Sequence, residues 1–192
     1  MVQIFGDFLE DTSDTPEFLL IGFSPSAIPL KQRWRNNGLS ASFIADYLIT
    51  FFPVDDNEVE MLDRRDKLIG AARYIANELL ENAMKFNYEE SQQPVSVKLE
   101  LKNNCVVFWA CNAIDPTGIE QFQAFIQELI TKNPSELLIR QVEKNSVEEW
   151  ESSGLGLLTI MDDYAAKLGW KFDTLTQTPC VTIVTTTVQL FL

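Results

Sequence analysis

The sequence of 192 residues contains no histidine. This absence excludes Ser-His-Asp and Cys-His catalytic pairs, and it excludes a kinase that phosphorylates a histidine of its own. Cysteine is also scarce, with only Cys105, Cys111 and Cys180. Three cysteines at these spacings match neither a disulfide framework nor a zinc motif, so we expect buried structural thiols.

Basic residues are few, with 15 Lys and Arg against 28 Asp and Glu, and the formal net charge is −13. Such a charge disfavours binding to nucleic acid or to an anionic membrane surface. No apolar run approaches the ~20 residues of a membrane span. The start, MVQIFGDFLEDTSD, lacks the basic region of a signal peptide. We therefore expect a cytoplasmic protein.

The first half of the chain has two helical patterns. Residues 43–52 form an apolar segment that Ser40 or Ser42 can cap and that Pro53 stops. Residues 58–87 carry apolar side chains at spacings of three and four, which predicts one long amphipathic helix. Together they predict a helical hairpin, and the long apolar face predicts a homodimer formed through it.

The remaining patterns alternate between strand and helix periods. We expect strands at 17–25, 95–101, 105–111, 170–175 and 180–192, and helices at 118–130, 134–144 and 155–169. Helices and hairpins in this order predict an α+β fold with helices on one face of a largely antiparallel sheet. We divide the chain into an N-terminal segment with the hairpin, 1–67, for dimerisation or output, and a ligand-binding domain, 68–192.

The first segment with chemical potential is NELLENAMKF, residues 77–86. Glu78 and Asn82 are four residues apart, so they share a helix face. The amide oxygen of Asn82 is a hard ligand suited to Mg²⁺, and the Glu78 carboxylate can accept a proton from an attacking hydroxyl. Lys85 lies three residues beyond Asn82, where it can meet a phosphate. An ordinary amphipathic helix explains the same residues equally well.

The second segment is SSGLGLLTI, residues 152–160, where Gly154 and Gly156 flank Leu155 at the start of an expected helix. Glycines let backbone N–H groups approach an anion, and a helix N-terminus adds partial positive charge. Ser153 precedes them and joins the candidate phosphate-binding residues. A flexible loop with a helix cap is the structural alternative.

Together these two segments resemble the GHKL superfamily of histidine-kinase-like ATPases. ELLENAMKF looks like its N-box and SGLGL like its G2 box, over roughly residues 68–192. The whole chain, including KQRWRNNGLSASFIADYL, further resembles SiaB-like kinases and related cyanobacterial regulators. The resemblance implies a Bergerat-type α/β sandwich, ATP or ADP with Mg²⁺ held by Asn82, and Glu78 as catalytic base if the protein is a kinase.

The sequence departs from the family where adenine is recognised. In place of the Asp-x-Gly-x-Gly loop stands CNAIDPTGIE, with Asp115 and Gly118 as the nearest candidates and Asn112 as a substitute. The stretch before the glycines, SVEEWESS, is acidic, which repels a triphosphate unless a metal intervenes. Trp150 in that stretch and Phe86 after the N-box are aromatic residues that can cover a planar ligand.

These departures leave two functions open. We favour a signalling sensor whose pocket binds a flavin, FMN or FAD, and responds to light or redox change through protein contacts. The alternative is an ATP-dependent Ser/Thr kinase of the anti-sigma or SiaB type in a partner-switching pathway. The expected partner is a STAS-like antagonist or a response-regulator or phosphatase protein. A third reading is an interaction module with an empty pocket.

Overall fold

The structure, a computed structural model, describes residues 1–12, 17–24, 37–53, 59–102, 104–145, 154–175 and 180–192. Within them an antiparallel sheet has the strand order β1-β5-β6-β4-β3-β2. Its strands are β1 (Val2–Gly6), β2 (Phe18–Phe23), β3 (Val95–Lys102), β4 (Cys105–Ile114), β5 (Lys167–Leu175) and β6 (Val181–Phe191). The α+β class expected from the sequence is confirmed.

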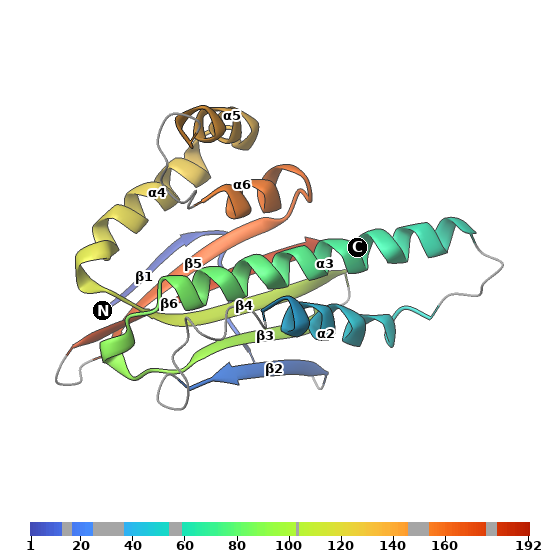
Figure 1. The fold of residues 1–192 in the computed structure, drawn as a ribbon, viewed down its shortest axis with the longest axis horizontal. Helices are drawn as coiled ribbons and strands as arrows, with labels where there is room; N and C mark the ends of the chain where they lie inside the picture. Colours follow the sequence, from blue (N-terminus) through green and yellow to red (C-terminus); the bar gives the residue numbers. More distant parts are fainter. Residues whose placement is uncertain (13–16, 25–36, 54–58, 103, 146–153, 176–179) are drawn as a thin grey trace.

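The helices lie over one face of this sheet (Figure 1). The described residues form α2 (Asn37–Ile49), α3 (Val59–Lys85), α4 (Ile119–Thr131), α5 (Pro134–Asn145) and α6 (Leu155–Asp162). Helix α3 packs on β3 and β4, and α6 packs against α3 and α5. This is the layering of an α/β sandwich, and the narrower GHKL assignment stays a prediction. None of the described helices is both long and apolar enough to cross a bilayer.

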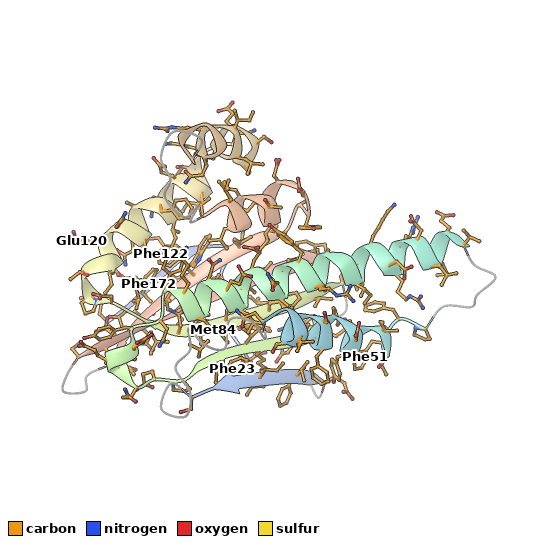
Figure 2. All side chains as sticks on the ribbon, viewed as in Figure 1. Phe23, Phe51, Met84, Glu120, Phe122 and Phe172 are labelled. Atoms are coloured by element: carbon orange, nitrogen blue, oxygen red, sulfur yellow. The ribbon has the colours of Figure 1, made fainter. Side chains whose placement is uncertain are left out.

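The core lies between the helices and the inner sheet face. It includes Ile75 and Leu79 from α3 and Phe108 and Trp170 from the strands, all at most 1% exposed. Helix α4 joins it through Phe122, whose ring centroid is 5.9 Å from that of Phe172 on β5 (Figure 2). Burial of side chains this large is the main stabilising contribution to the fold.

Helices α2 and α3 pack side by side, and Arg73 of α3 lies 3.2 Å from Asp46 of α2. The buried residues of α3 run from Ile69 to Met84 and face the sheet and α2. The long apolar face that suggested a homodimer is therefore largely consumed inside one chain. The role of the hairpin in dimerisation, and the division of the chain at residue 67, stay predictions.

The helix expected at 155–169 is wrong in its second half. Helix α6 ends at Asp162, Ala165 has a left-handed φ of 48°, and β5 begins at Lys167. Gly169, expected to close the helix, is instead a strand residue between β1 and β6. Pairing with strands about 20 and 160 residues away overrides the local helical pattern here.

Two further expectations need correction. Strand β1 was not expected, because its pairing with β5 joins segments at opposite ends of the sequence. The thiols are not uniformly buried, since Cys105 and Cys111 are half-buried and Cys180 is exposed. The first 23 residues supply both edge strands, so the N-terminal segment shares one sheet with the rest of the chain.

Candidate functional site

The two motif segments meet where α6 crosses α3. A Cβ added at Gly156, in the first turn of α6, would overlap Oε2 of Glu78. The Glu78 carboxyl thus occupies the space that any other residue at position 156 would fill. Segments separated by more than 70 residues in the sequence are brought into direct contact.

Glu78 is half-buried, and no hydrogen bond joins its carboxyl to another described residue. Burial raises the pKa of this carboxyl, and the neighbouring Glu81 carboxylate raises it further. A carboxylate with a raised pKa is a better proton acceptor at neutral pH than an ordinary glutamate. Glu78 therefore has the electrostatic setting of a general base, in contact with a helix N-terminus.

Aromatic residues form one wall beside Glu78. Tyr74, one turn earlier on α3, lies near the Thr159 side chain of α6, and its ring centroid lies 5.5 Å from that of Tyr164. Burial raises the pKa of the Tyr74 hydroxyl, the Thr159 side chain opposes this, and the Glu78 charge adds to it. The sequence analysis missed Tyr74 and Thr159, although the spacing 74, 78, 82 places Tyr74 on the same helix face.

Asn82 lies one turn beyond Glu78 and is half-buried, so its amide oxygen stays a candidate Mg²⁺ ligand. Within the described residues there is no group of three or more His, Cys, Asp or Glu side chains that could hold a metal. Lys85 and Phe86 follow at the exposed end of α3, with the Lys85 Nζ 5.4 Å from the Phe86 ring centroid. Phe86 is 44% exposed and is not part of the core.

Asn112 of β4 is 6% exposed and joins the strand to the end of α3. Its Nδ2 donates to the Ala113 carbonyl at 2.9 Å and to the Phe86 carbonyl at 3.5 Å. Asn87 strengthens the junction, because its Oδ1 accepts from the Ala113 N–H at 3.2 Å. The amide donors of Asn112 thus serve backbone carbonyls, and its role in reading a base stays a prediction.

Asp115 and Gly118 lie outside this contact, in a short 3-10 turn after β4. The Asp115 carboxylate accepts hydrogen bonds from the Thr117 hydroxyl at 2.7 Å and the Thr117 N–H at 2.8 Å. These bonds hold the pKa of Asp115 below its ordinary value. Gly118 has φ −92° and open space where a Cβ would stand, so its backbone does not require glycine. Their local role is to cap and close this turn.

Gly154 is the residue before α6, and its backbone requires glycine. Its φ is +103°, and a Cβ would lie 2.6 Å from Cζ of Phe125 on α4. Leu155 follows as the first, half-buried residue of the helix. Trp150 and Ser153, the other candidates in this motif, lie outside the described residues.

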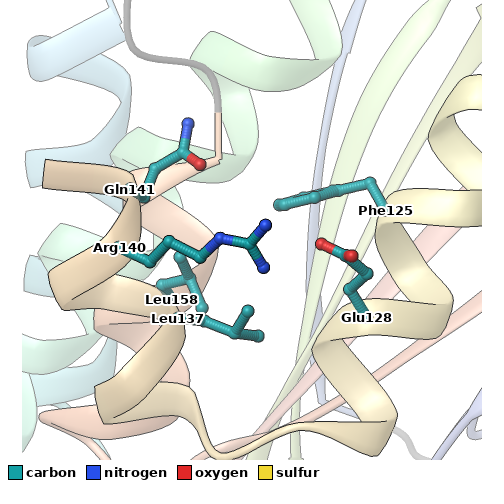
Figure 3. Close-up of a pocket in the computed structure, with 6 residues that line it drawn as sticks. All are labelled: Phe125, Glu128, Leu137, Arg140, Gln141 and Leu158. Atoms are coloured by element: carbon teal, nitrogen blue, oxygen red, sulfur yellow. The ribbon is translucent and has the colours of Figure 1, made fainter. Parts of the chain in front are cut away.

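Beside Gly154, a cavity of about 110 Å³ lies between α4, α5 and α6 (Figure 3). It is lined by Phe125, Glu128, Leu137, Arg140, Gln141 and Leu158. The Arg140 guanidinium points across it toward Phe125 and Glu128 (Figure 3). Arg140 is distant from Gly154 in the sequence, but the fold brings it to this cavity. Phe125, which lines the cavity, also contacts the space beside Gly154.

No family model matches this sequence, and no curated protein matches it. A chain in the crystal structure of the SiaB–SiaC complex from Pseudomonas aeruginosa has a similar fold, with a TM-score of 0.57 and 13% sequence identity. The similarity covers 90% of this chain and 89% of that chain. The likeness shows that the two chains share an α+β fold.

Proposed function

We propose that this protein is a signalling regulator of the partner-switching type, which binds ATP between α3 and α6 and transfers phosphate to a hydroxyl of a protein partner. The observation that carries the proposal is the contact between Glu78 and Gly156. Similarity of fold to a chain of the SiaB–SiaC complex supports the partner-switching reading. A STAS-like antagonist is the partner that this reading implies.

The residues at the contact fit a magnesium nucleotide by their chemistry. Gly154 and Gly156 add no side chain of their own at the start of α6, and the backbone N–H groups of a helix N-terminus suit phosphate oxygens. Asn82 offers the amide oxygen for Mg²⁺. The bound nucleotide supplies the phosphoryl group. Phosphate can approach Gly156 only if the Glu78 side chain leaves this position by adopting another rotamer.

In this proposal Glu78 takes the proton from the attacking hydroxyl. Its half-buried position raises its pKa, which improves the match between acceptor and hydroxyl. The ring of Tyr74 packs near that of Tyr164, and α3 packs on α6 beside Glu78. General-base catalysis of this kind contributes about 10²–10⁴-fold in rate.

The test is a calorimetric titration of ATP with and without Mg²⁺ into the wild type and two variants. We expect Mg²⁺-dependent binding in the wild type, lost Mg²⁺ dependence in Asn82→Ala, and no binding in Gly156→Val. Glu78→Gln should keep binding and lower slow ATP hydrolysis about 10²-fold or more, with Glu60→Gln on the exposed part of α3 as the matched control. Equal binding in the wild type and Gly156→Val would contradict the proposal.

The flavin sensor favoured by the sequence analysis stays a prediction. Its stacking residue Trp150 lies outside the described residues, and no described contact favours it. An absorption spectrum of the purified protein decides between the two ligands. A yellow protein that releases FMN or FAD on denaturation would replace the kinase proposal.

A further inference from the structure

The sheet face opposite the helices is crossed by the segment that follows β1, residues Asp7–Asp11, here called the crossover segment. The Trp109 indole N–H donates to the Leu9 carbonyl at 2.8 Å, and the Gln189 amide donates to the Asp7 carbonyl at 2.7 Å. These bonds attach the segment to β4 and β6. Part of the outer face beside the segment stays open.

This open part of the outer face is a groove of about 440 Å³. The strand register places Thr185, Cys111 and Ser96 side by side on β6, β4 and β3, and these small side chains form its floor. Larger apolar residues, Leu175 and Ile183 among them, form its sides. A volume of this size lies in the range of functional binding sites, which are mostly apolar with a few polar groups.

Apolar side chains stand exposed at both ends of the groove. Phe18 and Leu20 on β2 are 51% and 56% exposed, and Val2 and Ile4 on β1 are 51% and 53% exposed. All four belong to the same outer face as the floor, since Leu20 is paired with Lys98 and Ile4 with Lys171. Exposed apolar side chains beside an open groove mark a protein-interaction site rather than an enclosed small-molecule pocket.

The charges beside the groove indicate which charge a bound partner should carry. Lys98 is bound to Asp11 at 2.7 Å and to the buried Glu100 at 2.6 Å, and Lys171 is bound to Glu10 at 3.1 Å, so carboxylates neutralise both lysines. Asp173 also lines the groove, and within the described residues its carboxylate forms no ion pair or hydrogen bond. The groove therefore presents one uncompensated negative charge between apolar walls.

We propose that this groove docks an amphipathic segment of a partner protein, which places apolar side chains against the Leu20 and Ile183 walls and a lysine or arginine beside Asp173. The inference goes beyond the proposed function, because the groove lies on the opposite side of the sheet from Glu78 and Gly156. It holds whether or not ATP binds.

The experiment measures the fluorescence anisotropy of a short, labelled helical peptide made of leucine and lysine, titrated with the full chain. We expect saturable binding that Asp173→Asn weakens roughly tenfold and that Leu20→Glu abolishes. The matched control is Asp63→Asn on α3, which removes the same charge from an exposed position on the other side. Equal losses in Asp173→Asn and Asp63→Asn would mean non-specific attraction to the acidic protein and would overturn the proposal.

A second measurement does not depend on any variant. The thiol of Cys111 lies in the groove floor, whereas Cys105 lies at the other end of β4, outside the groove lining. Bound peptide should slow the reaction of Cys111 with a maleimide several-fold and leave Cys105 unchanged, as mass spectrometry of the labelled peptides will show. An unprotected Cys111 at saturation would overturn the proposal. So would a wild-type dimer in light scattering that Leu20→Glu dissociates, because the groove would then hold a second copy.

Discussion

The two faces of the sheet are formed by the same strands but differ in how deeply their side chains are buried. The inner face carries Phe108 and Trp170 under α3, α4 and α6, and those residues are fully buried. The outer face carries Lys98 and Lys171, each bound to a carboxylate of the crossover segment, and Trp109, which is 4% exposed and donates a hydrogen bond to the same segment. Neighbouring residues of one strand therefore contribute different amounts to the stability of the fold. Burial under the helices fixes the inner face, and the outer face beside the crossover segment is left available for contacts.

The largest expected effect compares adjacent residues on β5. Phe172→Ala removes a ring that is 2% exposed and packed against Phe5 and Phe122, and we expect a loss of about 3–5 kcal/mol in the free energy of unfolding. Lys171→Met breaks only the partly exposed pair with Glu10 and should cost at most about 1 kcal/mol. Urea denaturation measures the free energy of unfolding of both variants. Similar losses would show that the two faces contribute equally to stability.

The next effect separates two glycines on the helix side. Gly154→Ala places a Cβ on a residue with φ +103° and against Phe125, so we expect a loss of about 1–3 kcal/mol. Gly118→Ala is the matched control, because that site has open space and an ordinary φ of −92°. We expect it to be neutral or to stabilise by about 0.4–1 kcal/mol. Thermal unfolding of the two variants checks the difference.

A smaller effect sharpens the description of the outer face. Trp109→Phe keeps a phenyl ring but removes the pyrrole part of the indole, whose N–H donates to the Leu9 carbonyl. We expect the lost hydrogen bond to account for about 0.5–1.5 kcal/mol of the loss in stability. Amide hydrogen exchange should accelerate in the crossover segment and stay unchanged in α3, because the two lie on opposite faces. Faster exchange throughout α3 would show that the segment supports the whole fold.

The smallest effect concerns the pH dependence of stability at the candidate site. The folded-state pKa of Glu78 is raised above its unfolded value, so the wild type loses stability as pH rises from the unfolded pKa through the folded one. Glu78→Gln lacks this loss. We expect the variant to gain stability relative to the wild type between acidic and neutral pH, and to match it below both pKa values. A difference that is constant with pH in urea denaturation would contradict the raised pKa.

Much of the fold could be predicted from the sequence because its signals are local. The spacing of apolar residues in 58–87 predicts α3, and alternation in 95–101 predicts β3, within two residues at each end. Strand β1 and the start of β5 could not be predicted in this way, because their conformation is set by pairing with each other across the length of the chain. A helical pattern over 163–169 gave way to these long-range hydrogen bonds.

The candidate site divides in the same manner. Residue types and spacing selected Glu78, Asn82 and the glycines 154 and 156, because a helix face and a glycine-rich turn are readable along the chain. Tyr74, Thr159 and Phe125 beside them were not found, since their importance lies in contacts between helices. Asp115 and Gly118 were found by motif, yet the structure places them in a separate turn with its own hydrogen bonds.

By itself, the sequence determined the class of the fold, the acidic charge, the absence of histidine chemistry and the helix that carries Glu78. Those properties depend on composition and on periods of two or three to four residues. Only the tertiary structure decided that Glu78 meets Gly156, that the apolar face of α3 is consumed within the chain, and that a groove opens on the outer face. These depend on which distant segments pack together, and packing is a property of the whole chain.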